Sequence, residues 1–148
     1  MVNINLSLSV PLNPPGASPI ITLKHAWAAF VHKARRPQDF IPVVSSCTII
    51  SETPTSIACE VSFHPGVGHE RVIREVCTLH PPCRIDYEIE GGSTAVNTIS
   101  EMPDGELIMT FTFGWAHPDV EEGSDEERQL RDKHFEVSHP RAAEESPC

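Results

Sequence analysis

The strongest constraint on the fold is a stretch of alternating apolar and polar residues, broken by short turns, over residues 43–117. Near its end, large apolar side chains occupy every second position: Leu107, Met109, Phe111, Phe113 and Trp115. A period of two places alternate side chains on one face of a strand. Turn signals at residues 65–68, 91–92 and 103–105 leave only short connections, which favour antiparallel pairing. The region therefore predicts about six antiparallel strands.

The N-terminal part adds one more strand and a helix. Residues 1–10 also alternate, and the proline-rich segment 11–19 predicts a loop. An apolar stripe at helical spacing then follows Thr22, a residue type suited to a helix N-cap. Because Pro37 ends this pattern, we predict a helix from Thr22 to about Arg35, packed by Trp27 and Phe30. Residues 39–42 predict a short turn.

The C-terminal part predicts a second, charged helix. Ser124 and Glu127 have the spacing of a capping box, and Pro140 is expected to end the helix. Its apolar side is thin: Leu130, Phe135 and Val137. The whole order predicts an α+β helix-grip fold, with a curved antiparallel sheet of about six to seven strands around a shortened C-terminal helix. We expect one domain over residues 1–138 and a disordered tail over residues 139–148.

Charge and composition limit the partners. The 148 residues include 11 basic and 21 acidic residues, a net charge of −10. Nucleic acids and anionic membranes are bound mainly by Lys and Arg, so neither is an expected partner. No apolar run approaches the roughly 20 residues that cross a bilayer. Residues 1–10 lack the basic start and apolar block of a signal peptide. We therefore expect a soluble, cytoplasmic protein with reduced cysteines.

Cofactor and metal signatures are missing from the sequence. The eight histidines show no spacing that brings three ligands together, so no metal site is predicted. No phosphate-binding loop, dinucleotide fingerprint or Gly-x-Ser-x-Gly nucleophile motif is present either. Lys33, Arg35 and Arg36 form a basic group at the predicted helix end, where they complement the helix dipole. We expect no cofactor.

Several short motifs resemble the fungal family typified by acetylaranotin biosynthesis cluster protein L. They are PLNPPG at 11–16, KARRPQDFIP at 33–42, REVC at 74–77, NTIS at 97–100 and GELIMTFTFGWAHP at 105–118. The resemblance implies a START-like helix-grip fold and a role in fungal secondary metabolism, of mycotoxin or epidithiodiketopiperazine type. The chain departs from the family pattern at Gly114, where an acidic residue is usual, and at 138–141, which interrupts the last helix.

An apolar pocket is the main candidate site. The aromatic run of the last strand and Phe63 on another strand predict a binding floor formed by Phe63, Met109, Phe111, Phe113 and Trp115, because ligand pockets are largely apolar. Ordinary core packing beneath the last helix explains the same residues equally well. If these residues form a ligand pocket, the expected partner is a small apolar metabolite.

The polar candidates are Glu75, Tyr87 and Asn97. Alternate side chains of a strand point to opposite faces of the sheet, which leaves two possibilities open here. Either Glu75 or Arg74 faces inward, together with the apolar residues next but one to it. A carboxylate inside an apolar cavity has its pKa raised and becomes a usable general acid or base. A Glu–Arg ion pair outside the sheet is the structural alternative. Tyr87 and Asn97 share faces with apolar neighbours, where each orients a substrate carbonyl or satisfies buried backbone groups.

Three functions compete at this point. The first is a cofactor-independent enzyme that guides cyclisation, isomerisation or dehydration of an apolar intermediate, with Glu75, Tyr87 and Asn97 as catalytic residues. The second is a noncatalytic carrier that uses the same pocket. The third is a degenerate paralogue, which the interrupted last helix makes a real alternative. A carboxylate without a partner in the cavity favours the enzyme, whereas a purely apolar cavity favours the carrier.

Overall fold

The computed structural model describes residues 1–66 and 72–138, with side chains described as far as Phe135. Seven strands, two α-helices and one 3₁₀ turn follow one another in the described residues. In chain order they are β1 (Val2–Pro11), α1 (Leu23–Arg35), η1 (Pro37–Asp39), β2 (Val44–Thr53), β3 (Ser56–Phe63), β4 (Ile73–His80), β5 (Arg84–Ile89), β6 (Thr94–Glu101), β7 (Leu107–His117) and α2 (Asp125–Ser138). The predicted α+β class is confirmed.

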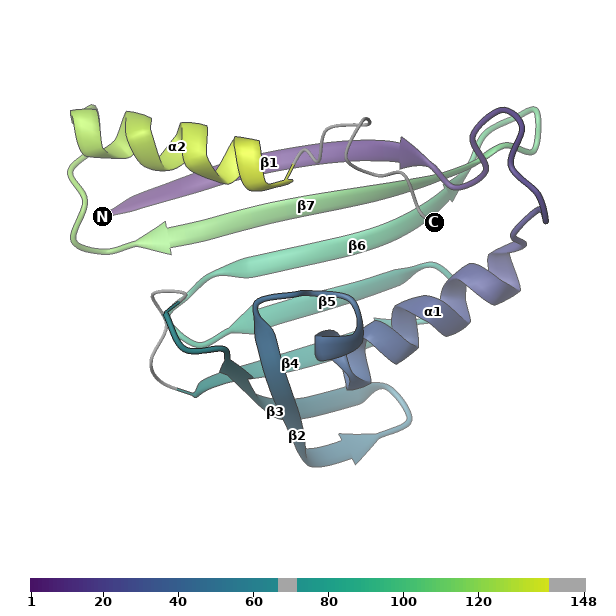
Figure 1. The fold of residues 1–148 in the computed structure, drawn as a ribbon, viewed down its shortest axis with the longest axis horizontal. Helices are drawn as coiled ribbons and strands as arrows, with labels where there is room; N and C mark the ends of the chain where they lie inside the picture. The colour runs from purple at the N-terminus through teal and green to yellow at the C-terminus, as the bar shows by residue number, and fades with distance from the viewer. Residues whose placement is uncertain (67–71, 139–148) are drawn as a thin grey trace.

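All seven strands form one curved sheet in the order β1-β7-β6-β5-β4-β3-β2 (Figure 1). Every neighbouring pair is antiparallel, as predicted. The first strand of the chain pairs with the last, so that Val2 lies opposite His117 and Pro11 opposite Ile108. β2 forms the other edge, and its pairing with β3 is interrupted by two irregularities, which bend an edge strand away from a flat ladder.

The register places one set of side chains on the inner face of the sheet. Cys77 lies opposite Ile57 and Tyr87, Tyr87 opposite Ala95, and Ala95 opposite Phe113. On β7 the same face carries the alternating aromatic run. The predicted grouping of these odd-numbered residues is therefore confirmed.

α1 packs on this inner face. The Thr22 side chain accepts a hydrogen bond from the His25 N–H and caps the helix, as predicted. Ala26, Phe30 and Ala34 are buried, and the Phe30 ring centroid lies 6.3 Å from that of Phe111 on β7. Trp27 is partly buried against the same core. The ends of α1 match the prediction, whereas the expected turn over residues 39–42 begins earlier, as η1.

α2 lies along β1, on the same face of the sheet as α1 (Figure 1). Its capping box forms, since Ser124 Oγ accepts the Glu127 N–H at 3.2 Å and the Glu127 carboxylate accepts the Gly123 N–H. Leu130 packs against a small cluster of Val2, Ile4 and Val120, whereas Phe135 is exposed. The Val137 side chain, Pro140 and the expected tail lie outside the described residues. No described helix combines the length and apolar character needed to span a bilayer.

Candidate functional site

A cavity lies between α1, η1 and the inner face of β3, β4 and β5. We call it the Glu75 cavity, and it has a volume of about 160 Å³. Its lining is mostly aliphatic and aromatic, with three side chains that carry polar tips; the lining residues are Lys33, Pro37, Ile41, Val44, Val61, Phe63, Ile73, Glu75, Tyr87 and Ile89. An apolar cavity of roughly 150 Å³ accommodates a benzene molecule, so this space fits one six-membered ring.

Glu75 is the inward-facing member of the Arg74–Glu75 pair. It lies opposite Cys59 on β3 and Ile89 on β5, both neighbours on the inner face. Arg74 points to the outer face, where its Nη2 lies 3.4 Å from Glu60 Oε1. Burial raises the pKa of the Glu75 carboxyl above its usual range, and the Lys33 charge opposes part of this shift. Glu75 therefore has the placement and the electrostatic environment of a general acid or base.

Lys33 reaches the same cavity from α1. Its Nζ lies 5.3 Å from the centre of the Phe111 ring, a cation–π distance. Burial lowers the pKa of the Lys33 amine, and the nearby Glu75 charge opposes part of that shift. Among the side chains described in residues 1–66 and 72–135, none forms an ion pair or hydrogen bond with the Lys33 amine. Lys33 and Glu75 therefore both line the cavity without forming an ion pair with each other.

Sequence reasoning missed Lys33, because it assigned the residue to a basic group that complements the helix dipole. In the structure that group is divided: Arg35 pairs with Glu52 and Arg36 with Asp39, while Lys33 lines the cavity. The helical spacing carried a usable signal. Lys33 follows Ala26 by seven residues and Phe30 by three, which are positions on the buried face of a helix.

Tyr87 supplies a polar atom to this apolar environment. The residue is buried on β5, lines the Glu75 cavity, and its hydroxyl has no hydrogen-bond partner within the described part of the chain. Burial raises the pKa of the Tyr87 phenol, and the neighbouring Asn97 amide opposes this shift weakly. The phenol is therefore neutral. Asn97 itself is buried on β6 and does not line the Glu75 cavity.

The five apolar residues expected to bind ligand are spread over the inner face. Phe63 lines the Glu75 cavity. Met109 lines a second pocket, beside the 12–22 loop and α1. Phe111 packs beneath Phe30 and Lys33, whereas Phe113 stacks on Trp115 with ring centroids 4.8 Å apart.

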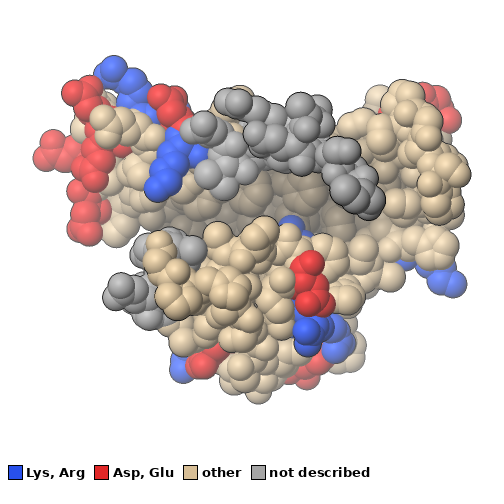
Figure 2. Space-filling model, viewed as in Figure 1, with Lys and Arg blue, Asp and Glu red and all other residues tan. Residues whose placement is uncertain are grey.

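Phe113 and Trp115 lie in the space between the two helices. Trp115 stacks on His134 of α2 at 4.0 Å, and Phe111 contacts α1, so Phe113 lies between these two contacts. The molecular surface is hollowed between the part formed by β1, β7 and α2 and the part formed by α1 and β2–β4 (Figure 2). Of the five residues expected to form one floor, Phe63 and Met109 line separate pockets, and α1 rather than the C-terminal helix α2 packs over Phe111.

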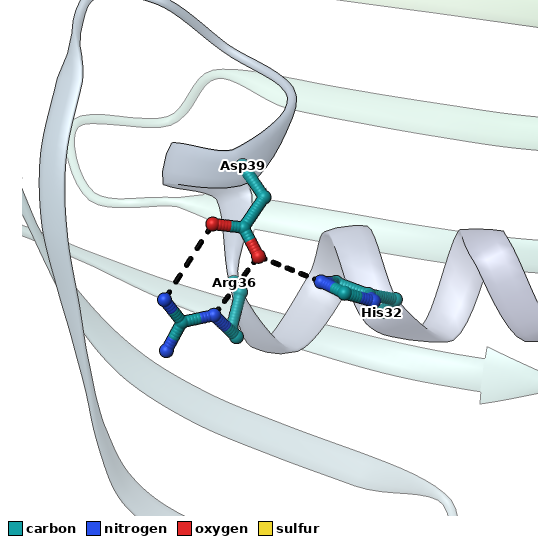
Figure 3. Close-up of polar contacts among 3 residues, drawn as sticks. All are labelled: His32, Arg36 and Asp39. Atoms are coloured by element: carbon teal, nitrogen blue, oxygen red, sulfur yellow. Dashed lines mark hydrogen bonds and ion pairs between the residues drawn. The ribbon is translucent and has the colours of Figure 1, made fainter.

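A polar cluster at the end of α1 fixes one wall of the Glu75 cavity. The Asp39 carboxylate lies 2.7 Å from His32 Nε2 and accepts a hydrogen bond from Arg36 Nε at 2.9 Å (Figure 3). These contacts tie the last turn of α1 to η1, whose first residue, Pro37, is buried and lines the cavity. The Arg36 hydrogen bond, followed by that of His32, lowers the pKa of Asp39.

Three cysteines lie close together beside Glu75. Cys59 and Cys77 are fully buried on β3 and β4, and Cys47 of β2 is partly buried. Burial and the Cys59 thiol raise the pKa of Cys47 to about 12. A hydrogen bond with Cys59, together with burial, raises the pKa of Cys77 as well. These two thiols are protonated at neutral pH and act as small apolar side chains.

Among the side chains described in residues 1–66 and 72–135, no group of three or more His, Cys, Asp or Glu has a metal-binding geometry. Among the histidines expected at strand ends, His80 lies 3.3 Å from Asp86, and His69 lies outside the described residues. Gly114, a departure from the family pattern, lies between Asn5 and Thr94 on the outer face, away from the cavity.

Solved structures share this architecture. The di-domain ARO/CYC StfQ from the steffimycin biosynthetic pathway matches with a TM-score of 0.68 and 14% identity, over 92% of this chain and 46% of that one. The ZhuI aromatase/cyclase from Streptomyces sp. R1128 matches with a TM-score of 0.62 and 16% identity, over 92% and 86%. Ara h 8.0201 matches with a TM-score of 0.60 and 13% identity, over 90% and 91%.

These likenesses show the helix-grip fold, and the chain spans about half the length of the di-domain protein StfQ. Comparison of the sequence with curated proteins finds no match. The sequence does match the family described as AtaL, acetylaranotin biosynthesis cluster protein L, over residues 6–146. Because that match covers most of its length, the chain belongs to the AtaL family.

Proposed function

We propose that this protein binds an apolar, carbonyl-bearing intermediate of fungal secondary metabolism in the Glu75 cavity and assists its cyclisation, isomerisation or dehydration. The protein acts without a cofactor, in the cytoplasm, in a mycotoxin pathway of which the epidithiodiketopiperazine type is one example. The observation that carries the proposal is the Glu75 carboxyl in a mostly apolar cavity, with no ion pair to it among the side chains described in residues 1–66 and 72–135.

Glu75 is the proton-transfer group of this mechanism. Burial raises the pKa of the Glu75 carboxyl, which makes its carboxylate a stronger proton acceptor than an exposed one. Removal of a proton next to a carbonyl generates an enolate, and the same group then protonates the product or the leaving hydroxyl. The apolar walls exclude water, which strengthens each electrostatic interaction in the cavity.

Tyr87 orients the substrate carbonyl. Its hydroxyl is buried and lacks a hydrogen-bond partner among the described residues, and the residue lines the same cavity, which favours a ligand oxygen as the acceptor. A donor fixed before the reaction stabilises negative charge as it develops on the carbonyl oxygen. Asn97, buried on the next strand, acts as a positioning residue for Tyr87 and does not contact the substrate.

The aromatic floor binds the remainder of the substrate. The Glu75 cavity accepts one ring, and Phe113 and Trp115 continue the same face of the sheet toward α2. A substrate longer than one ring therefore places its reactive end near Glu75 and the rest over these two side chains. The known aromatase/cyclases that share the fold support a reaction of this class.

The alternative function is a noncatalytic carrier for the same metabolite, and the predominantly apolar lining favours it. Purified protein, incubated with extract from a strain that lacks its gene, separates the possibilities. Wild type is expected to deplete one metabolite and generate another. Glu75→Gln is expected to bind that metabolite but lose most of the turnover. Glu88→Gln, an exposed change on β5, is the matched control and is expected to retain turnover.

Binding without turnover by the wild-type protein would contradict the enzyme and favour the carrier. If the wild-type protein neither binds nor converts a metabolite, the degenerate paralogue is the remaining explanation. Full turnover by Glu75→Gln would remove Glu75 from the mechanism.

A further inference from the structure

We infer that Lys33 is a covalent catalytic residue, whose amine condenses with a carbonyl carbon of the ligand held in the Glu75 cavity. The inference deepens the proposed function and rests on it, because it assumes that the cavity ligand carries a carbonyl. It names the substrate class more narrowly, as a ketone or aldehyde attached to a group about the size of one ring.

The first support is the position of the amine. Lys33 lines a cavity that is otherwise mainly apolar, and it approaches from α1, across the cavity from the strands that carry Glu75 and Tyr87. A carbonyl group held between the helix and the sheet is therefore accessible from both sides. The other lysines of the chain, Lys24 and Lys133, are exposed on helix surfaces.

The second support is the way in which the amine is held. Its described contact is the Phe111 ring, 5.3 Å from Nζ, and no carboxylate forms an ion pair with it within the described residues. An ammonium group with so few stabilising contacts in an apolar site loses its proton readily, which agrees with the lowered pKa of Lys33. The neutral amine is the nucleophilic form of lysine.

The third support is Glu75, which supplies the proton transfers. The Lys33 nitrogen forms a bond to the carbonyl carbon while the carbonyl π pair moves to oxygen, which takes a proton from the Glu75 carboxyl. The nitrogen then returns one proton to Glu75. A second protonation of the hydroxyl by Glu75 breaks the C–O bond, releases water and leaves an iminium ion. No oxidant or reductant is required.

The iminium ion connects this step to ring formation. It makes the adjacent C–H more acidic, so Glu75 removes that proton and generates an enamine. The enamine carbon attacks a second carbonyl of the same substrate and forms the new C–C bond, while the π pair of that carbonyl moves to its oxygen, which takes the proton back from Glu75. Addition of water to the resulting iminium ion then breaks the C–N bond and frees Lys33.

Trapping with benzaldehyde tests the inference directly, because its single ring matches the cavity volume. Cyanoborohydride delivers hydride to any iminium carbon and leaves a benzyl group fixed on the nitrogen, which peptide mapping locates. We expect Lys33 to be labelled several-fold faster than Lys24 and Lys133, because the cavity holds the aldehyde next to the Lys33 amine. Equal or slower labelling of Lys33 would overturn the inference.

Variants add a readout that a merely exposed lysine would not change. Glu75→Gln is expected to slow labelling of Lys33 and leave that of Lys24 unchanged, while Glu88→Gln changes neither. Lys33→Arg keeps the positive charge but is expected to lose turnover of the extract metabolite, whereas Lys24→Arg retains it. The wild-type labelling pattern remains decisive if a Lys33 variant fails to fold.

The outcomes distinguish this inference from the proposed function. If Glu75→Gln abolishes turnover while Lys33 is not preferentially labelled and Lys33→Arg stays active, covalent catalysis is wrong and the proposed function stands. If Lys33 is labelled selectively but the wild type converts no metabolite, the reactive amine stands and the proposed enzyme is wrong.

Discussion

Glu75 and Lys33 occupy positions where an apolar pair would pack with a lower electrostatic cost. Burial shifts the pKa of each toward its neutral form, and the attraction between them only partly offsets this effect. An incompletely paired charge in an apolar site reduces stability. Such sites are expected where function, rather than folding, selects the residue, because active sites often reduce stability. The incompletely paired charges of Glu75 and Lys33 therefore distinguish the Glu75 cavity from the rest of the core.

Glu75→Gln is expected to increase the free energy of unfolding at neutral pH. Because folding raises the Glu75 pKa, the folded state holds its proton to a higher pH than the unfolded state does. The contribution of Glu75 to stability is therefore fully present below the pKa that the carboxyl has in the unfolded chain. It is lost as the pH rises through the higher pKa that the carboxyl has in the folded protein. Denaturant unfolding at several pH values measures the effect, and the gain of the variant should grow from acidic to neutral pH.

Glu88→Gln provides the control, since this exposed side chain is expected to change stability by less than about 0.5 kcal/mol. A Glu75→Gln variant that is less stable than wild type at neutral pH would show that the carboxylate is satisfied in the folded state. That result would also remove the electrostatic basis of its proposed role.

Among the elements, α1 determines where the cavity lies. Its buried face carries Ala26, Phe30 and Ala34, and contact with Phe111 holds the helix against the sheet. Lys33 and the neighbouring η1 then close one side of the Glu75 cavity. α2, in contrast, lies along β1 and covers Trp115 through His134. The two helices therefore cover opposite ends of the same inner face.

Phe30→Ala is expected to destabilise the protein by about 3–5 kcal/mol, the usual cost of truncating a buried aromatic residue. The variant should also lose ligand binding, because Lys33 and Pro37 depend on the docking of α1. Phe40→Ala is the comparison, since Phe40 is 47% exposed and should cost much less. Denaturation curves compare the two, and similar losses would contradict the assignment of Phe30 as the anchor of α1.

α2 is expected to loosen from the sheet in mild acid. Burial, followed by the charges of His117 and Lys133, lowers the pKa of His134 from 6.5. The unfolded chain therefore binds more protons as pH falls below about 6.5, and stability declines toward the folded-state pKa. The Nε2 atoms of His117 and His134 are 2.9 Å apart, so two charged rings would also repel.

Trp115 reports on this change, because it stacks on His134 and Trp27 is the other tryptophan of the chain. In a Trp27→Phe background, tryptophan emission should change with a midpoint below pH 6.5, and His134→Gln should remove the transition. A transition that persists in His134→Gln would assign the effect to another group. His64→Gln, an exposed change, serves as the control.

The strands and α1 were predictable because their signals are local. A period of two over 107–115 and a stripe from Leu23 to Ala34 depend only on neighbouring residues. The orientation of Glu75 was not predictable, because apolar residues would face inward whether the odd-numbered or the even-numbered residues of that strand did so. The location of the cavity was not predictable either, because it depends on contact between Phe30 and Phe111, which are 81 residues apart.

The inner face of the seven-stranded sheet is larger than the area that α1 and α2 cover. The surface is hollowed between them (Figure 2), and half-buried Phe113 and Trp115 lie between the contacts made by α1 and α2. The Glu75 cavity lies on the same inner face of the sheet, beneath α1 and η1. A substrate with a reactive ring and an apolar extension would fit this arrangement, with the ring enclosed and the extension on the aromatic floor.

The central claim is that the Glu75 cavity, rather than another surface, binds a ring that carries a carbonyl group. Isoleucine-methyl NMR tests this claim with residues already present in the chain. Ile41, Ile73 and Ile89 line the cavity, whereas Ile50 is exposed on β2 and Ile108 lies on β7 outside it. The probe is 4-hydroxy-6-methyl-2-pyrone, a single ring with an enolisable carbonyl. The account predicts that it shifts the methyl signals of Ile41, Ile73 and Ile89 together, with one saturation curve, and leaves Ile50 and Ile108 in place. Saturable shifts at Ile50 or Ile108 with the three cavity methyls unchanged, or no saturable shift at all, would contradict it.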